Sequence, residues 1–119
     1  MTNADITTGA VLNSGSGTWT SLSDRNYKKE VEPIDPNVVL ERVVAMPISE
    51  WSYLNQDGVR HIGPMAQDFF AAFGLGVDDK GITSLDGAGV ALAAIQGLHA
   101  QNAELRERIS EKEAALARV

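Results

Sequence analysis

The C-terminal end of the chain reads IQGLHAQNAELRERISEKEAALARV, residues 95–119. Its apolar residues recur at alternating steps of three and four, which is the heptad repeat abcdefg of a coiled coil. Positions a hold Ile95, Asn102, Ile109 and Leu116, and positions d hold Leu98, Leu105, Lys112 and Val119. Upstream, Ala88 and Ala91 continue this register with small side chains that permit close helix approach. The pattern predicts a long helix that associates with copies of itself along this a/d seam.

The residues of the seam leave the number of associating helices open. β-Branched residues at a, Leu at d and a buried Asn102 favour two strands, which would make the chain a dimeric coiled-coil adaptor. A monomeric surface helix is disfavoured, because the register holds over more than three heptads. Asn102 and Lys112 cost stability inside a seam and would fix its register.

Upstream of this helix, the sequence carries the signals of a helix and a hairpin. Asp35 and Pro36 predict the N-cap and the first residue of a helix, which Pro47 ends. Residues 48–53 and 59–63 alternate between apolar and polar side chains on either side of an Asn- and Gly-containing turn. That arrangement predicts two strands of a β-hairpin.

The next stretch predicts a second short helix from Pro64 to about Phe73, with Gly74 as its C-cap. Residues 82–85 have the composition of a short third strand, and Asp86 is expected to cap the long helix. The predicted fold class is therefore α+β: a small mixed domain with a β-hairpin and two short helices, followed by a long C-terminal helix that forms a trimeric coiled coil. The trimer comes from a family resemblance described below.

Three segments divide the chain. Residues 1–22 are rich in Gly, Ser, Thr and Asn and alternate only weakly, so they are expected to be a linker or the end of an upstream β-rich fibre. Residues 23–86 form the expected α+β core, and residues 87–119 form the coiled-coil helix.

Composition excludes several classes of function. The 119-residue chain has a net charge of -6 and no extended basic patch, so nucleic acid is not an expected partner. No apolar run has the length of a membrane span, and no membrane partner is expected. The chain has no cysteine and no calcium-loop spacing, so neither a metal site nor a cofactor is expected.

Ser23 and Lys28 form a candidate Ser/Lys dyad at the start of the core. A lysine can accept the serine proton only when it is neutral, so burial or a nearby cation must lower its pKa. Arg25 and Lys29 act in that direction, whereas the acidic residues around them oppose it. The spacing alone is more typical of a solvated, mixed-charge lead-in to a helix.

Three motifs and the coil occur in an order that resembles a known family. They are SDRNYK (23–28), VEPI (31–34) and RHIGPMAQD (60–68). Together they are similar to the C-terminal intramolecular chaperone domain of phage endosialidases, tailspikes and tail fibres, a self-cleaving serine peptidase family (family seventy-four). The similarity covers roughly residues 20–112.

The resemblance implies a homotrimer that assists the folding of an upstream β-helical or fibrous segment of the same polypeptide and then releases itself. It implies that Ser23 is the nucleophile, that Lys28 is the base and that the Leu22–Ser23 peptide bond is cut. It also implies action in the cytoplasm of the bacterial host during assembly, with the parent protein in a virion tail or cell-surface fibre.

Three further polar residues are candidates for support of the reaction. Arg60 and His61 could stabilise an oxyanion, as backbone amides could, although the favoured role of His61 is that of a structural histidine in the hairpin. Gln67 could orient a neighbouring group or face water. A non-catalytic trimeric cap or attachment module is the alternative function, because such a module needs the coil and the core but neither Ser23 nor Lys28.

Overall fold

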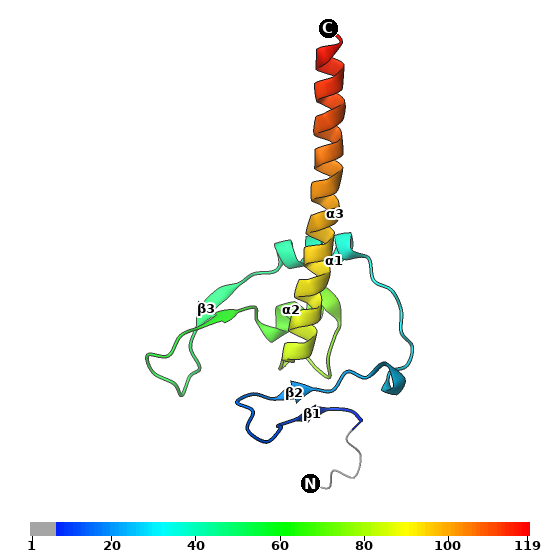
Figure 1. The fold of residues 1–119 in the computed structure, drawn as a ribbon. Helices are drawn as coiled ribbons and strands as arrows, with labels where there is room; N and C mark the ends of the chain where they lie inside the picture. Colours follow the sequence, from blue (N-terminus) through cyan, green and yellow to red (C-terminus); the bar gives the residue numbers. More distant parts are fainter. Residues whose placement is uncertain (1–6) are drawn as a thin grey trace. The chain divides into compact units, whose positions relative to one another are not determined.

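The computed structural model describes residues 7–119, so the first six residues of the predicted upstream segment lie outside it. The chain divides into two compact units, Met1–Pro33 and Ile34–Val119. Figure 1 shows the order of the elements along the chain. The division into segments at residues 22/23 and 86/87 stays a prediction.

The first unit contains a small hairpin and one short helix. Strands β1 (Ala10–Val11) and β2 (Thr20–Ser21) are antiparallel, with Val11 opposite Thr20. The Leu22 amide donates to the Gly9 carbonyl at 2.7 Å and so extends the pairing by one residue. A 3₁₀ helix, η1 (Arg25–Tyr27), follows directly.

The second unit is organised around the predicted long helix, α3 (Ser84–Ala117). Thr83 is its N-cap, because the Thr83 hydroxyl accepts a hydrogen bond from the Asp86 amide at 3.0 Å. Two predictions here are wrong: residues 82–85 form no strand, and Asp86 lies in the first turn rather than at the cap. An acidic side chain in that turn is favourable, because the positive end of the helix dipole lies there.

Helix α1 (Pro36–Ala45) confirms the predicted start. The Asp35 carboxylate accepts from the Asn37 amide at 3.0 Å, and Pro36 occupies the first turn. This helix packs against α3 at Gly97, where a Cβ atom would collide with the Pro36 carbonyl oxygen and come within 3.0 Å of the Leu40 Cβ. Only glycine permits this approach.

The predicted hairpin is confirmed but shorter than expected. Strands β3 (Ser49–Trp51) and β4 (His61–Gly63) pair antiparallel, with Trp51 opposite His61. Helix α2 (Ala66–Phe73) follows, two residues later than predicted, since Pro64 precedes it and Met65 is its N-cap. Gly74 ends it in the left-handed conformation at φ 63°, as predicted.

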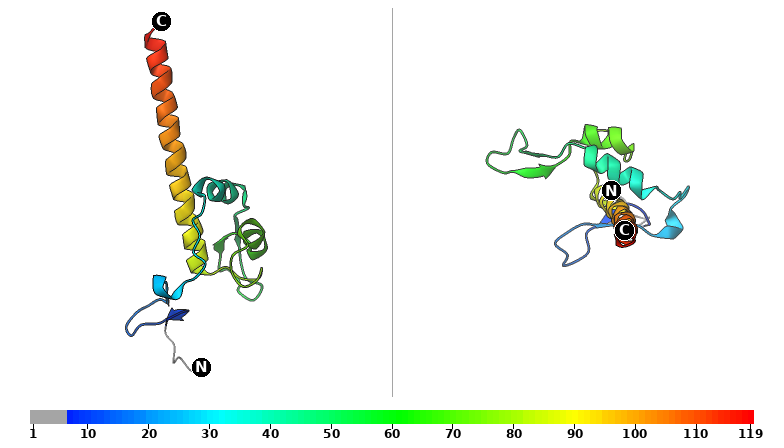
Figure 2. Two further views of the ribbon diagram at one scale, coloured as in Figure 1. Left: turned by 90° about the vertical axis from the view of Figure 1, so that its right-hand side faces the viewer. Right: turned by 90° about the horizontal axis from the view of Figure 1, so that it is seen from above.

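Within this unit, α1, α2 and the β3–β4 hairpin lie on one side of α3, as the view along the helix shows (Figure 2). The buried residues among 7–119 are Phe69, Val90, Ala94 and Gly97. Three of the four lie on α3 at heptad positions c and g. The a/d seam is a different face of the same helix, and no element of the unit covers it.

The far half of α3 is exposed along its whole length. Every residue from Leu98 to Val119 is exposed, and Figure 1 shows this part of the helix standing clear of the other elements of its unit. Within residues 7–119, no helix combines the length and the apolar content needed to cross a membrane.

We predict that Gly97→Ala destabilises the fold by roughly 1–3 kcal/mol, because the added methyl group forces α1 away from α3. Gly89→Ala is the matched control: Gly89 lies in the same helix, and a Cβ there meets nothing within 4 Å. This control should gain up to about 1 kcal/mol from helix propensity. Urea unfolding of both variants at one protein concentration measures the difference, and equal stability of the two would contradict the packing described.

Candidate functional site

A capped turn holds the residues of the predicted dyad. The Asp24 carboxylate accepts hydrogen bonds from the Asn26 backbone amide at 2.9 Å and from the Asn26 side-chain amide at 3.0 Å. It thereby caps η1, and the amides of Tyr27 and Lys28 close the turn onto the carbonyls of Asp24 and Arg25. This short helix folds five residues of chain back on themselves.

The turn brings Lys28 and Ser23 into contact. The Lys28 ammonium donates to the Ser23 Oγ at 2.5 Å. Removing one proton from the ammonium would reverse this hydrogen bond, because the serine hydroxyl would then donate to a neutral amine. The pair therefore has the geometry that proton transfer from serine to lysine requires. Both side chains are exposed in the single chain.

The peptide bond between Leu22 and Ser23 lies where the hairpin meets the turn. On its N-terminal side, the Leu22 amide is held by the Gly9 carbonyl, and the Leu22 side chain is half-buried. On its C-terminal side, η1 begins after one further residue. The bond thus lies between a hydrogen-bonded residue of the hairpin and the capped turn.

Sequence reasoning missed the positioning role of Asp24 and Asn26, since it treated Asp24 only as a negative charge beside the lysine. The signal was present. An Asp two residues before an Asn is typical of an Asx turn, in which the carboxylate accepts from the backbone amide two residues on.

His61 lies in the hairpin among aromatic rings. Its ring centroid is 5.0 Å from that of Trp51 and 5.3 Å from that of Tyr53, and its Nε2 is 2.8 Å from the Gln56 Oε1. These contacts tie the histidine to the strands and the turn of the hairpin, as the structural alternative for this residue expects.

Arg60 and Gln67 lie on different elements. The Arg60 guanidinium donates to the Glu50 carboxylate at 3.0 Å and to the Ser52 hydroxyl at 3.2 Å, so it bridges side chains of the hairpin. Gln67 is exposed on α2. A supporting role for His61, Arg60 or Gln67 in chemistry at Ser23 stays a prediction.

The acidic loop before α3 holds one exposed ion pair. The Lys80 ammonium lies 2.8 Å from the Asp79 carboxylate, and this hydrogen bond lowers the pKa of Asp79 and raises the pKa of Lys80. Exposed pairs of this kind contribute little stability. Across residues 7–119, no group of three or more His, Cys, Asp or Glu side chains is arranged to hold a metal ion.

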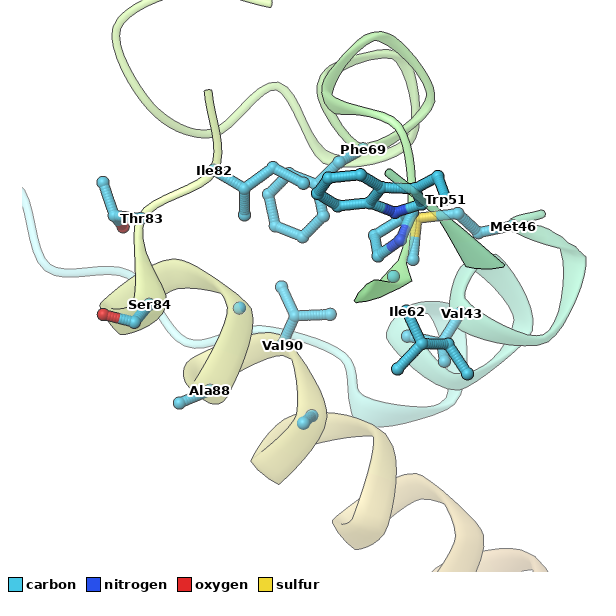
Figure 3. A pocket seen from close by; sticks show the side chains of 14 residues that line it. Val43, Met46, Trp51, Ile62, Phe69, Ile82, Thr83, Ser84, Ala88 and Val90 are labelled. Atoms are coloured by element: carbon cyan, nitrogen blue, oxygen red, sulfur yellow. The ribbon is translucent and has the colours of Figure 1, made fainter. Parts of the chain in front are cut away.

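An apolar groove opens beside the N-terminal part of α3 (Figure 3). Its volume is about 510 Å³. Side chains from α1, the hairpin, α2 and α3 line it, and none of them is charged; the larger ones are Val43, Met46, Trp51, Ile62, Phe69, Ile82 and Val90. The indole N–H of Trp51 is buried and has no hydrogen-bond partner within the described chain.

The seam residues are exposed in the single chain. Ile95, Leu98, Leu105, Ile109 and Leu116 keep between 50% and 75% of their surface exposed. Asn102 and Lys112 lie on the same stretch and are exposed too. An apolar stripe of this length along one helix face is unusual for a monomeric soluble protein and marks a surface for association.

Comparison with protein families gives one match. The family model described as "Chaperone of endosialidase" matches residues 23–77, which is just under half of the chain. The match begins at Ser23, the predicted nucleophile, and ends before α3. No curated protein and no solved structure matches the chain significantly. The resemblance inferred from the motifs is thus confirmed by a family match over residues 23–77.

Proposed function

We propose that this chain is an intramolecular chaperone that trimerises, assists the folding of an upstream β-rich segment of the same polypeptide, and then cuts itself free between Leu22 and Ser23. The observation that carries the proposal is the 2.5 Å contact between Lys28 and Ser23, at the first residue of the matched segment. The family description supports the chaperone role and, through its serine peptidase class, the self-cleavage.

The division of α3 into two faces supports self-association. Its c/g face packs against α1 within the chain, whereas its a/d face is left without cover over the whole length predicted as a coil. A helix end of this length has little stability in water without tertiary packing. Other copies of α3 would supply that packing, at about 1.5–3 kcal/mol for each large apolar side chain that becomes buried.

Three copies, rather than two, follow from the family resemblance. Phage proteins of this kind wind three chains into one fibre, so a trimeric chaperone would match the symmetry of its client. We accordingly place the working assembly in the cytoplasm of a bacterial host, and the released client in a virion tail or cell-surface fibre.

The proposed reaction is acyl transfer followed by hydrolysis. Neutral Lys28 takes the proton of the Ser23 hydroxyl as the Oγ attacks the Leu22 carbonyl carbon. The C–N bond to Ser23 then breaks, and the Lys28 ammonium returns its proton to the leaving nitrogen, which becomes a free amine. Water attacks the resulting Leu22 ester, giving a Leu22 carboxylate and restoring the serine hydroxyl.

Assembly is expected to switch this reaction on. A solvated lysine has a pKa of about 10.4 and is protonated at neutral pH, so it cannot serve as a base. Lys28 is exposed in the single chain. Neighbouring copies that cover Lys28 would exclude water from it, and exclusion of water favours the neutral form of an amine.

The exposure of Ser23 and Lys28 also favours a second candidate, a trimeric cap that stays attached to its fibre. Such a module would use the same seam and the same core. It would have no need for a neutral lysine, and substitutions in the dyad would leave it unchanged.

The first prediction for this function concerns the cut. The wild-type protein should lose residues 1–22 and begin at Ser23, whereas Ser23→Ala and Lys28→Arg should remain whole. Arginine keeps the positive charge but cannot become a base, so the second variant separates charge from proton transfer. Intact mass measurement distinguishes these outcomes. Equal processing of the wild type and Ser23→Ala would favour the attached cap.

The second prediction concerns Asp24. Asp24→Ala loses the cap of η1, worth about 0.5–2 kcal/mol, and should slow cleavage several-fold. Asp24→Asn is the matched control, because asparagine is an equally good N-cap, and it should cleave at close to the wild-type rate. Uncut chains isolated in urea and diluted into buffer give both rates. Cleavage of Asp24→Ala at the wild-type rate would remove Asp24 from the site.

The third prediction concerns the seam. Leu105→Asp places carboxylates in the centre of the coil and should abolish both assembly and cleavage. Ala103→Asp is the control, because position b faces away from the seam while the loss of helix propensity is similar. Sedimentation measures assembly and a denaturing gel measures cleavage. Full cleavage in a monomeric Leu105→Asp variant would show that the dyad acts without neighbours.

A further inference from the structure

The apolar groove beside α3 is incomplete in the single chain. Ile62 of β4 lies at its wall with 77% of its surface exposed. The buried indole N–H of Trp51 has no acceptor among residues 7–119. Buried polar groups and large apolar side chains in folded proteins usually find partners, so the groove has the features of one side of an interface.

The floor of the groove borders the coiled-coil seam. Gly87, Ala88 and Ala91 of α3 line it. In the heptad register, Ala88 is at a, Ala91 is at d and Gly87 is at g. Their small side chains leave room beside the helix where a neighbouring helix would pass.

Leu92 is an exposed apolar residue that neither face of α3 explains. It occupies position e, with 64% of its surface exposed. It lies outside the c/g face that packs on α1 and outside the a/d seam. In a parallel, in-register coil, position g of one helix faces position e of the next helix five residues further on. The residue opposite Gly87 is therefore Leu92 of a second copy.

We infer that Leu92 of one copy inserts into the groove of the next copy, beside Gly87 and against Ile62 and Met46. This inference rests on the proposed assembly and adds a contact outside the coil. The occupant is a second copy of this chain, because the groove is continuous with the seam and because its lining, which has no charged side chain, suits a leucine.

This contact would favour a particular number of chains in the assembly, which the seam alone does not fix at three. The seam residues favour two strands, whereas a contact between the flank of each helix and the core of the next closes a ring. It would also tie the folding of the α+β core to the association of the coil, since the hairpin wall of the groove would pack only in the assembled protein.

Cross-linking tests the contact directly, because the chain contains no cysteine. A tagged Leu92→Cys chain is refolded together with an untagged Ile62→Cys chain and treated with a short bismaleimide. Each chain carries a single thiol, so a tagged–untagged product arises only between copies. Val44→Cys replaces Ile62→Cys as the control: Val44 is 76% exposed, which matches Ile62, but it does not line the groove.

We expect the tagged–untagged product with Ile62→Cys to exceed that with Val44→Cys at least five-fold. Equal yields of the two, or none with Ile62→Cys, in samples that sedimentation shows to be assembled would overturn the groove contact and leave the proposed function intact. Samples that sediment as monomers would overturn the contact together with the assembly on which it rests.

Discussion

The close contact between α1 and α3 at Gly97 is the constraint on which the second unit depends. It joins the two helices so tightly that a single methyl group would collide with the Pro36 backbone. Because this contact uses the c/g face of α3, it leaves the a/d face free. The same glycine thus attaches the α+β core to the helix through a face other than the seam.

This arrangement makes a stable single chain improbable on physical grounds. Four residues are buried among residues 7–119, and a core of that size stabilises a chain only weakly. Burial of the seam on association would supply what the core lacks. Folding and assembly would then be one event, which is the behaviour required of a chaperone that registers three copies of a client before it leaves.

Local chemistry made part of this fold predictable. The cap at Asp35, the left-handed Gly74 and the heptads of the long helix each depend on a few neighbouring residues, so the sequence was sufficient for them. The start of α3 was misplaced because Thr83 and Asp86 are both good caps, and the short apolar run before them resembled a strand. Gly97 was missed for a different reason: its partner Pro36 is distant in sequence, and only the fold brings the two together.

The candidate site, too, was only partly predictable from the sequence. The spacing of Ser23 and Lys28 suggested a dyad, but the turn that joins them depends on Asp24 and Asn26, whose role became clear only from their hydrogen bonds. In the single chain the dyad is exposed. Cleavage by the dyad therefore depends on neighbouring copies that cover Ser23 and Lys28.

The most direct test of this account is native mass spectrometry of the purified wild-type protein at micromolar concentration. The account predicts a particle of three chains, with no appreciable dimer and no free monomer. A particle with the mass of one chain would contradict it, because the exposed seam of α3 would then be stable in water without a partner.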